Sequence, residues 1–245
     1  MLSADGGQIS ESQPSLTLGL RGAAALEVEV RALAADVHSG LAGGAVQNPA
    51  RALAQLLASM WAPNGSVAVG HFYRGVRPVT AEDRGDMQAL NYDDAVELVA
   101  GLGAVEGYGE AGYTTLERIW LRPTLEVVGL TSGFGGEGIK TIVPASARAK
   151  LAARLVPGQR PKEVLALLEA HITRNHPPAC NVTVRELGFS AHPYHMRRDS
   201  PVNAAAATVR PAAAAARSGG APCCHRWERV RGGLWAGPLT ALPQR

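Results

Sequence analysis

The stretch with the clearest potential for chemistry is residues 36–49, in which His38 stands between a predicted strand and a Gly-rich loop, residues 40–44. A histidine at that position can project its ring from the edge of a sheet. Near neutral pH such a ring can donate, accept or bind a metal. It can equally satisfy the backbone of the loop that follows it. Taken by itself, the position favours this second, structural interpretation.

The other histidines and the cysteines do not form a zinc site. His192 and His195 lie three residues apart, and His225 follows Cys223 and Cys224. Zinc in proteins takes about four ligands, or three and a water molecule. Neither group supplies that number, so we interpret both groups as ordinary surface or half-buried residues.

A glycine-rich segment could suggest a nucleotide site. Residues 133–138 read Gly-Phe-Gly-Gly-Glu-Gly and match the dinucleotide pattern G-x-G-x-x-G. That pattern needs a helix to begin at the loop, so that its N-terminus meets the pyrophosphate. Here Pro144 and an alternating strand follow instead, and Ile139 separates Gly138 from Lys140, which spoils a phosphate loop as well. We therefore reject a nucleotide-binding enzyme, the weakest of the hypotheses considered.

Composition limits the remaining classes of function. The 245 residues are 46% hydrophobic but only 5% aromatic, so they can bury an aliphatic core. The net charge of +3 is too small to indicate nucleic acid or a membrane surface as partner. Three cysteines do not suggest a disulfide framework. No signal peptide and no membrane helix is recognised, so a cytoplasmic location is expected.

Hydrophobic periodicity predicts the elements that must position these residues. Period-two alternation indicates strands at 26–30, 123–130 and 147–155, and a last strand opens at 182. Asn48 and Pro49 begin one helix and Pro161 begins another. Their predicted buried faces are Leu53, Leu56, Leu57 and Met60, and Val164, Leu167, Leu168 and Ile172. The order predicts an α+β fold: a ferredoxin-like split βαβ domain with a four-stranded antiparallel sheet and two helices.

Two regions fall outside that unit. Residues 61–121 are predicted to be an insertion with one helix starting near Thr80 and Asp83 and another at 93–102. Residues 204–245 are rich in Ala, Arg, Gly and Pro without periodicity, and we expect this tail to be poorly ordered.

Four ordered segments give the chain a family resemblance. They are residues 36–49, residues 18–22 (Leu-Gly-Leu-Arg-Gly), residues 133–144 and residues 153–158. Together they resemble the lid domain of the zinc metallopeptidase and deacylase family that includes carnosine dipeptidase, carboxypeptidase G, acetylornithine deacetylase and succinyl-diaminopimelate desuccinylase. On this resemblance, residues 1–20 end a catalytic-domain segment, residues 21–190 form the lid and dimerisation domain, and residues 191–203 return to the catalytic domain.

The resemblance also implies roles for four residues. His38 matches a lid histidine that crosses the dimer to the scissile carbonyl oxygen, where a donor stabilises developing charge. Thr141 matches a substrate-contacting residue that also acts across the dimer. Arg154 matches the arginine that grips the substrate carboxylate, although it could instead be a strand residue paired with a nearby acid. Asp5 matches a zinc ligand, with a turn aspartate as the alternative.

The implied partners are a second copy of the chain, two zinc ions, and a dipeptide or N-acyl amino acid. The family's other metal ligands and general base have no counterpart here, and a two-metal site needs both ions. We therefore expect a truncated zinc dipeptidase that is inactive alone. The alternative is a non-catalytic dimerisation or interaction module that pairs through an exposed strand edge.

Overall fold

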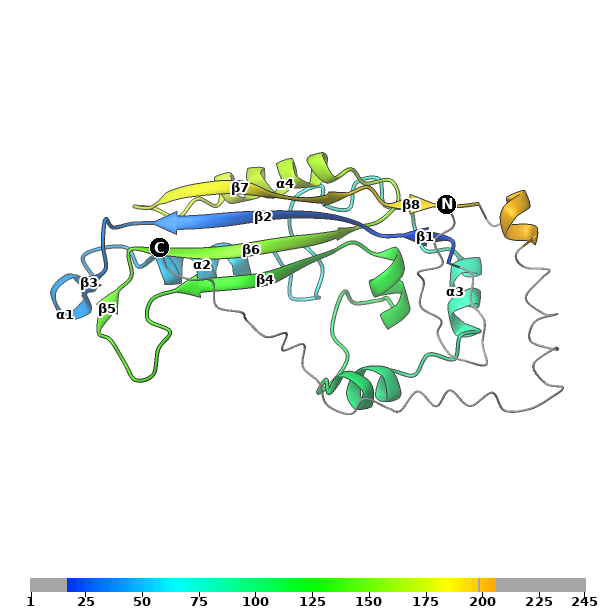
Figure 1. Ribbon diagram of the computed structural model, residues 1–245, viewed down its shortest axis with the longest axis horizontal. Coiled ribbons are helices and arrows are strands. Elements are labelled where there is room, and N and C mark those ends of the chain that lie inside the picture. Colours follow the sequence, from blue (N-terminus) through cyan, green and yellow to red (C-terminus); the bar gives the residue numbers. More distant parts are fainter. Residues whose placement is uncertain (1–16, 198, 206–245) are drawn as a thin grey trace, which may run out of the picture.

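A four-stranded antiparallel sheet is the main feature of the computed structural model, which describes residues 17–197 and 199–205. Its strands are β2 (Gly22–Arg31), β4 (Thr124–Ser132), β6 (Ser146–Leu155) and β7 (Asn181–Ala191). They lie in the order β4-β6-β2-β7 (Figure 1). The two long central strands pair along their whole length, from Gly22 with Leu155 to Arg31 with Ser146.

The predicted alternation of buried and exposed residues is confirmed in β2 and β6. In β2 the side chains of Leu26, Val28 and Val30 are fully buried, and in β6 the odd-numbered residues from Ala147 to Leu155 are buried with them. The even-numbered residues of β6, such as Arg148 and Arg154, face the other side. The sheet therefore has one apolar face and one face rich in charge.

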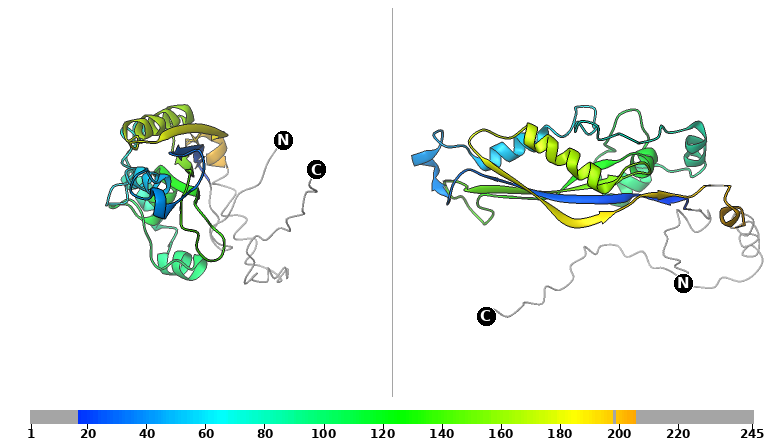
Figure 2. Two further views of the ribbon diagram at one scale, coloured as in Figure 1. Left: turned by 90° about the vertical axis from the view of Figure 1, so that its left-hand side faces the viewer. Right: turned by 90° about the horizontal axis from the view of Figure 1, so that it is seen from above.

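Two helices cover the apolar face (Figure 2). Helix α2 (Pro49–Ala58) begins as predicted, because Asn48 Oδ1 accepts from the backbone N–H groups of Ala50 and Arg51. Helix α4 (Pro161–Arg174) begins at Pro161 as predicted, but its predicted buried face needs correction. Leu165 and His171 are buried, whereas the predicted Leu167 is only partly buried.

Short elements flank the sheet. Strand β1 (Gly19–Leu20) pairs with β8 (Tyr194–His195), and β3 (Val37–His38) pairs with β5 (Ile142–Val143). Helix α1 (Ser39–Ala42) occupies part of the predicted loop at 40–44, so that loop prediction was wrong over one helical turn. His38 lies in this separate two-stranded sheet and not at an edge of the main one, because the chain leaves the main sheet at Arg31.

The predicted insertion contributes to the core and then extends away from it. Val67, Val69 and Phe72 join the buried cluster between sheet and helices. Helix α3 (Ala81–Gln88) starts at Thr80 with a reciprocal cap to Asp83, as predicted. The second predicted helix contains the π-helical segment η1 (Ala95–Ala100), and a further π-helical segment, η2 (Glu117–Leu121), was not predicted.

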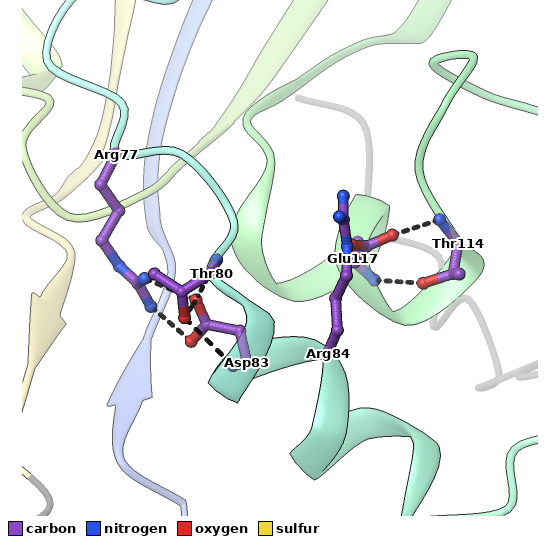
Figure 3. Close-up of polar contacts among 6 residues, drawn as sticks. All are labelled: Arg77, Thr80, Asp83, Arg84, Thr114 and Glu117. Atoms are coloured by element: carbon purple, nitrogen blue, oxygen red, sulfur yellow. Dashed lines mark hydrogen bonds and ion pairs between the residues drawn. The ribbon is translucent and has the colours of Figure 1, made fainter.

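A buried carboxylate holds α3 to η2 (Figure 3). Glu117 is 2% exposed, accepts from Arg84 Nε at 2.8 Å, and accepts from the backbone N–H of Thr114 at 2.6 Å. Burial alone would raise the pKa of Glu117, but these donors hold it below its usual value. Paired charge therefore adds to apolar packing in fixing the insertion.

Two expectations fall outside the described residues. The first is the zinc-ligand prediction for Asp5, which lies within residues 1–16. The second is the predicted tail, nearly all of which lies within residues 206–245. Within the residues that the structure does describe, no helix is both long enough and apolar enough to cross a membrane.

Candidate functional site

His38 and Thr141, 103 positions apart in the sequence, lie together. The pairing of β3 with β5 sets His38 opposite Ile142, and the backbone N–H of Ser39 donates to the carbonyl oxygen of Thr141 at 2.8 Å. The Thr141 hydroxyl then lies 3.3 Å from His38 Nε2. Both side chains are exposed. The short sheet thus brings two of the predicted site residues into direct contact.

The local backbone fixes the tautomer of His38. The N–H of Gly40 donates to Nδ1 at 2.9 Å, so the neutral ring carries its proton on Nε2. A side chain at position 40 would place its Cβ 2.7 Å from the His38 ring, which explains the glycine. Asp36 anchors the same segment by accepting from the N–H of Ala145 at 2.8 Å. The result is an outward-facing N–H donor on a braced loop.

The glycine-rich segment 133–138 leads to this site. It connects β4 to β5, and the chain enters a strand after it and not a helix. Gly133 and Gly138 have φ values of 66° and 82°, which favour glycine. Lys140 lies 4.5 Å above the ring of Phe134, a cation–π contact within the loop. The segment is therefore a loop that connects β4 to β5 and contains Thr141 at its end. It does not have the geometry of a dinucleotide-binding turn.

Arg154 lies at the other end of the main sheet. Its register partners are Ala23 on β2 and Thr124 on β4, and its side chain is on the face without helices. From Ser146, the residue of β6 nearest to β5, the distance along the strand is about 26 Å at roughly 3.3 Å per residue. In Figure 1 the β3–β5 sheet lies beyond one end of β6. Arg154 directly precedes Leu155, which ends β6 on the other side. One chain therefore does not bring Arg154 to His38 and Thr141.

Arg154 is exposed and makes no ion pair within the described part of the chain. The alternative interpretation, a strand arginine neutralised by an acidic neighbour, therefore gains no support there. On the same face, Arg148 and Arg31 do pair with Glu29, and Arg185 pairs with Glu27. Arg154 keeps a guanidinium with its donors available to a ligand.

No metal centre forms in the described residues. Among them, no three His, Cys, Asp or Glu side chains lie close enough to hold one ion together, and this includes His192 and His195. Asp5 lies outside that part of the chain. The described residues therefore do not fit a zinc site.

A half-buried serine–histidine pair was not predicted from the sequence. Ser59, at the end of α2, lies 2.9 Å from His171 Nε2 on α4, and its hydroxyl donates to the Leu56 carbonyl at 2.7 Å. Burial lowers the pKa of His171, and the nearby Arg174 lowers it further. Position 171 falls seven residues after Val164, two turns along the same face, and that spacing could have indicated it. The pair links the two helices.

Known proteins share this architecture. Residues 18–180 match the peptidase dimerisation domain of M20 peptidases. The chain is 30% identical to a Cys-Gly metallodipeptidase of Schizosaccharomyces pombe over 68% of its own length and 35% of that protein. It is also 30% identical to Beta-Ala-His dipeptidase of Rattus norvegicus, over 67% of the chain and 33% of that protein. The chain thus spans about a third of the length of these relatives.

Solved structures agree with the sequence comparison. The M20 family metallo-carboxypeptidase Sso-CP2 from Sulfolobus solfataricus has a TM-score of 0.75 and 31% identity, covering 86% of this chain and 54% of that one. Human carnosine dipeptidase 1 has a TM-score of 0.65 and 27% identity, covering 81% and 42%. Since the family match extends over more than half of its residues, the chain belongs to the peptidase dimerisation domain family of the M20 metallopeptidases.

Proposed function

We propose that the chain is the lid and dimerisation domain of an M20 dipeptidase or N-acyl amino acid deacylase. Residues 21–190 form this lid, with residues 61–121 as its insertion. The strand order, with α2 between β2 and β4 and α4 between β6 and β7, supports the split βαβ assignment. Residues 191–203 return to the catalytic domain, to which residues 1–20 also belong.

The separation between His38–Thr141 and Arg154 is the observation that carries the proposal. A dipeptide spans far less than about 26 Å, since each extended residue spans about 3.3–3.6 Å. A site that uses all three residues on one substrate must therefore combine the His38–Thr141 end of one chain with the Arg154 end of another. This is the cross-dimer arrangement expected from the family resemblance.

Edge-to-edge pairing of β4 would produce that combination. β4 is an edge strand with exposed apolar side chains, among them Val128 and Leu130. Two copies of β4 paired antiparallel about a two-fold axis set the Thr124 end of one chain beside the Ser132 end of the other. Arg154 lies next to Thr124, and the β3–β5 sheet lies beyond Ser132, so the two half-sites would meet twice per dimer.

In the proposed site each residue has one task. His38 donates its Nε2–H to the scissile carbonyl oxygen, where charge develops during attack. Thr141 orients that ring and contacts the substrate. Arg154 offers two parallel donors to the C-terminal carboxylate. Two zinc ions would supply the attacking hydroxide in such an enzyme, held by residues outside the described part of the chain; Asp5 is proposed as one ligand.

A mixing experiment tests the composite site. We would measure binding of a phosphinate dipeptide analogue, whose tetrahedral anion and carboxylate address both half-sites. His38→Gln and Arg154→Gln should each bind weakly alone. After the two variants are co-refolded, random pairing should restore about one quarter of the wild-type sites, because half of the dimers are mixed and each has one intact site. A mixture no better than the single variants would refute the proposal.

The free β4 edge also supports the alternative, a non-catalytic dimerisation module. Hydrolysis separates this from a self-sufficient enzyme. The purified chain with zinc should cleave no dipeptide above background, because its described residues bring together no metal site. Turnover by the chain would contradict this expectation.

A further inference from the structure

A second arginine accompanies Arg154 on the helix-free face of the sheet. Arg21 directly precedes β2, and strand alternation puts it on the same side as Ala23, the register partner of Arg154. Glu126 on β4 is on this face too, opposite Ala152. Two arginines and one carboxylate therefore surround one small area.

The floor of this area consists of alanines. Ala23 and Ala25 are only 3% and 6% exposed although they point away from the helices. Ala25 pairs with Ala152, so the methyl groups lie beneath the longer side chains of Arg21, Arg154 and Glu126. Their low exposure means that neighbouring side chains, and not water, cover these methyl groups, so the charged groups around them lie close to one another.

The two guanidinium groups lack acidic partners at ion-pair distance. Within residues 17–197 and 199–205, neither Arg21 nor Arg154 makes an ion pair or a side-chain hydrogen bond. At the other end of the same face Arg31 and Arg148 do have such a partner, because both form an ion pair with Glu29. Two like charges left close together are a cost that a bound anion would remove.

The three groups also lie close enough to influence one another electrostatically. Burial lowers the pKa of Arg21, the positive charge of Arg154 lowers it further, and Glu126 opposes both effects. Burial raises the pKa of Glu126, and Arg21 opposes that shift. The three side chains thus form one electrostatic unit with an excess positive charge.

We propose that Arg21 is a second arginine of the carboxylate site around Arg154, and that Glu126 limits the affinity of that site. Arg21 adds donors from the β2 side while Arg154 holds the carboxylate from β6. Glu126 repels a carboxylate at the empty site and so disfavours ligands with a second negative charge nearby. This inference rests on the proposed role of Arg154.

The test uses the full 245-residue chain and two matched ligands, N-acetylglycine and the uncharged N-acetylglycinamide. Arginine Nε–Hε resonances report binding at each guanidinium. N-acetylglycine should shift the Arg21 and Arg154 signals and N-acetylglycinamide should not. Arg21→Gln should weaken N-acetylglycine binding about five- to tenfold, as expected for a charge-assisted hydrogen bond in a partly solvated site. Arg21→Lys should lose only part of this.

Two further variants separate binding from stability. Glu126→Gln should tighten N-acetylglycine binding about two- to threefold, by removing repulsion. Arg148→Gln, on the same face but paired with Glu29, should leave affinity unchanged. Circular dichroism melts establish that each variant is folded.

The outcomes distinguish the two claims. If N-acetylglycine leaves the Arg154 signal unmoved in the unmodified chain, the role of Arg154 fails and this inference fails with it. If the Arg154 signal shifts but neither Arg21 variant changes the dissociation constant, only the role of Arg21 is overturned. Unchanged affinity in Glu126→Gln would overturn the role of Glu126.

Discussion

Substitution of Leu130 by lysine should dissociate the proposed dimer. Leu130 lies on the edge strand β4 and is 64% exposed in the single chain. Val128 on the same strand is 61% exposed. No other strand of the described sheet covers this edge, because β4 pairs only with β6. A pairing of two β4 strands would place both side chains against those of the partner strand and would satisfy the free edge of each sheet.

The exposed fraction of Leu130 sets the size of the effect. Full burial of a leucine side chain contributes about 1.5–3 kcal/mol, so burial of the exposed part contributes about 1–2 kcal/mol. A two-fold interface contains the residue twice, which gives about 2–4 kcal/mol per dimer. Since each 1.4 kcal/mol is a factor of ten, Leu130→Lys should raise the dissociation constant at least roughly 30-fold.

Sedimentation velocity at several protein concentrations measures this change. The opposite edge of the sheet supplies the control, because Phe189 on β7 is 55% exposed and offers a similar apolar area. Phe189→Lys should leave the monomer–dimer equilibrium unchanged. If Phe189→Lys dissociates the dimer and Leu130→Lys does not, the chains pair through β7 and the proposed meeting of the half-sites is wrong. A monomeric unmodified chain would refute the pairing altogether.

Three stability predictions follow from the described contacts. Gly158→Ala should destabilise the fold by at least about 2 kcal/mol in a thermal melt, because φ is 97° and the new Cβ would collide with the carbonyl of Gly75; Gly135→Ala, with open space around it, should have little effect. Glu117→Gln should cost about 1–3 kcal/mol, measured by urea unfolding, because Arg84 and the backbone of Thr114 lose the charge of a buried acceptor. The lowered pKa of His171 means that the folded state binds its proton less readily than the unfolded state, so stability should be complete above about pH 6.5 and should fall as the pH drops below it. His171→Gln should flatten that part of the urea-midpoint profile between pH 8 and pH 5, and an unaltered slope would contradict the assignment.

Local patterns predicted the long elements well. The alternation of Leu26, Val28 and Val30 specifies which face of β2 is buried, and Asn48 with Pro49 specifies where α2 begins. These signals work because each depends on residues within one strand or one helical turn. The face of α4 was less certain, since Leu165 and Leu167 both border the apolar stripe and only the position of β7 and β2 decides between them.

The short elements could not be predicted in the same way. A two-residue strand such as β3 has no period, and it exists because residues 37–38 meet residues 142–143. Helix α1 has four residues, too few to form from propensity alone. Both depend on contacts between distant parts of the chain, which no local pattern specifies. For the same reason the position of His38 on a separate small sheet had to come from the structure.

For the candidate site, the sequence indicated which residues to consider but not where they lie relative to one another. Thr141 and Arg154 belong to no motif of their own, and only the family resemblance singled them out. The structure adds that a straight ten-residue strand, β6, separates the two halves of the site. A strand of that length is too stiff to fold back on itself, so closing the distance within one chain would mean breaking its pairing with β2 and β4. In the proposed dimer, a second chain would supply the missing half with both sheets intact. On this argument, binding of a whole dipeptide is coupled to dimerisation, and dilution below the dimer dissociation constant should abolish the composite site while leaving each fold unchanged.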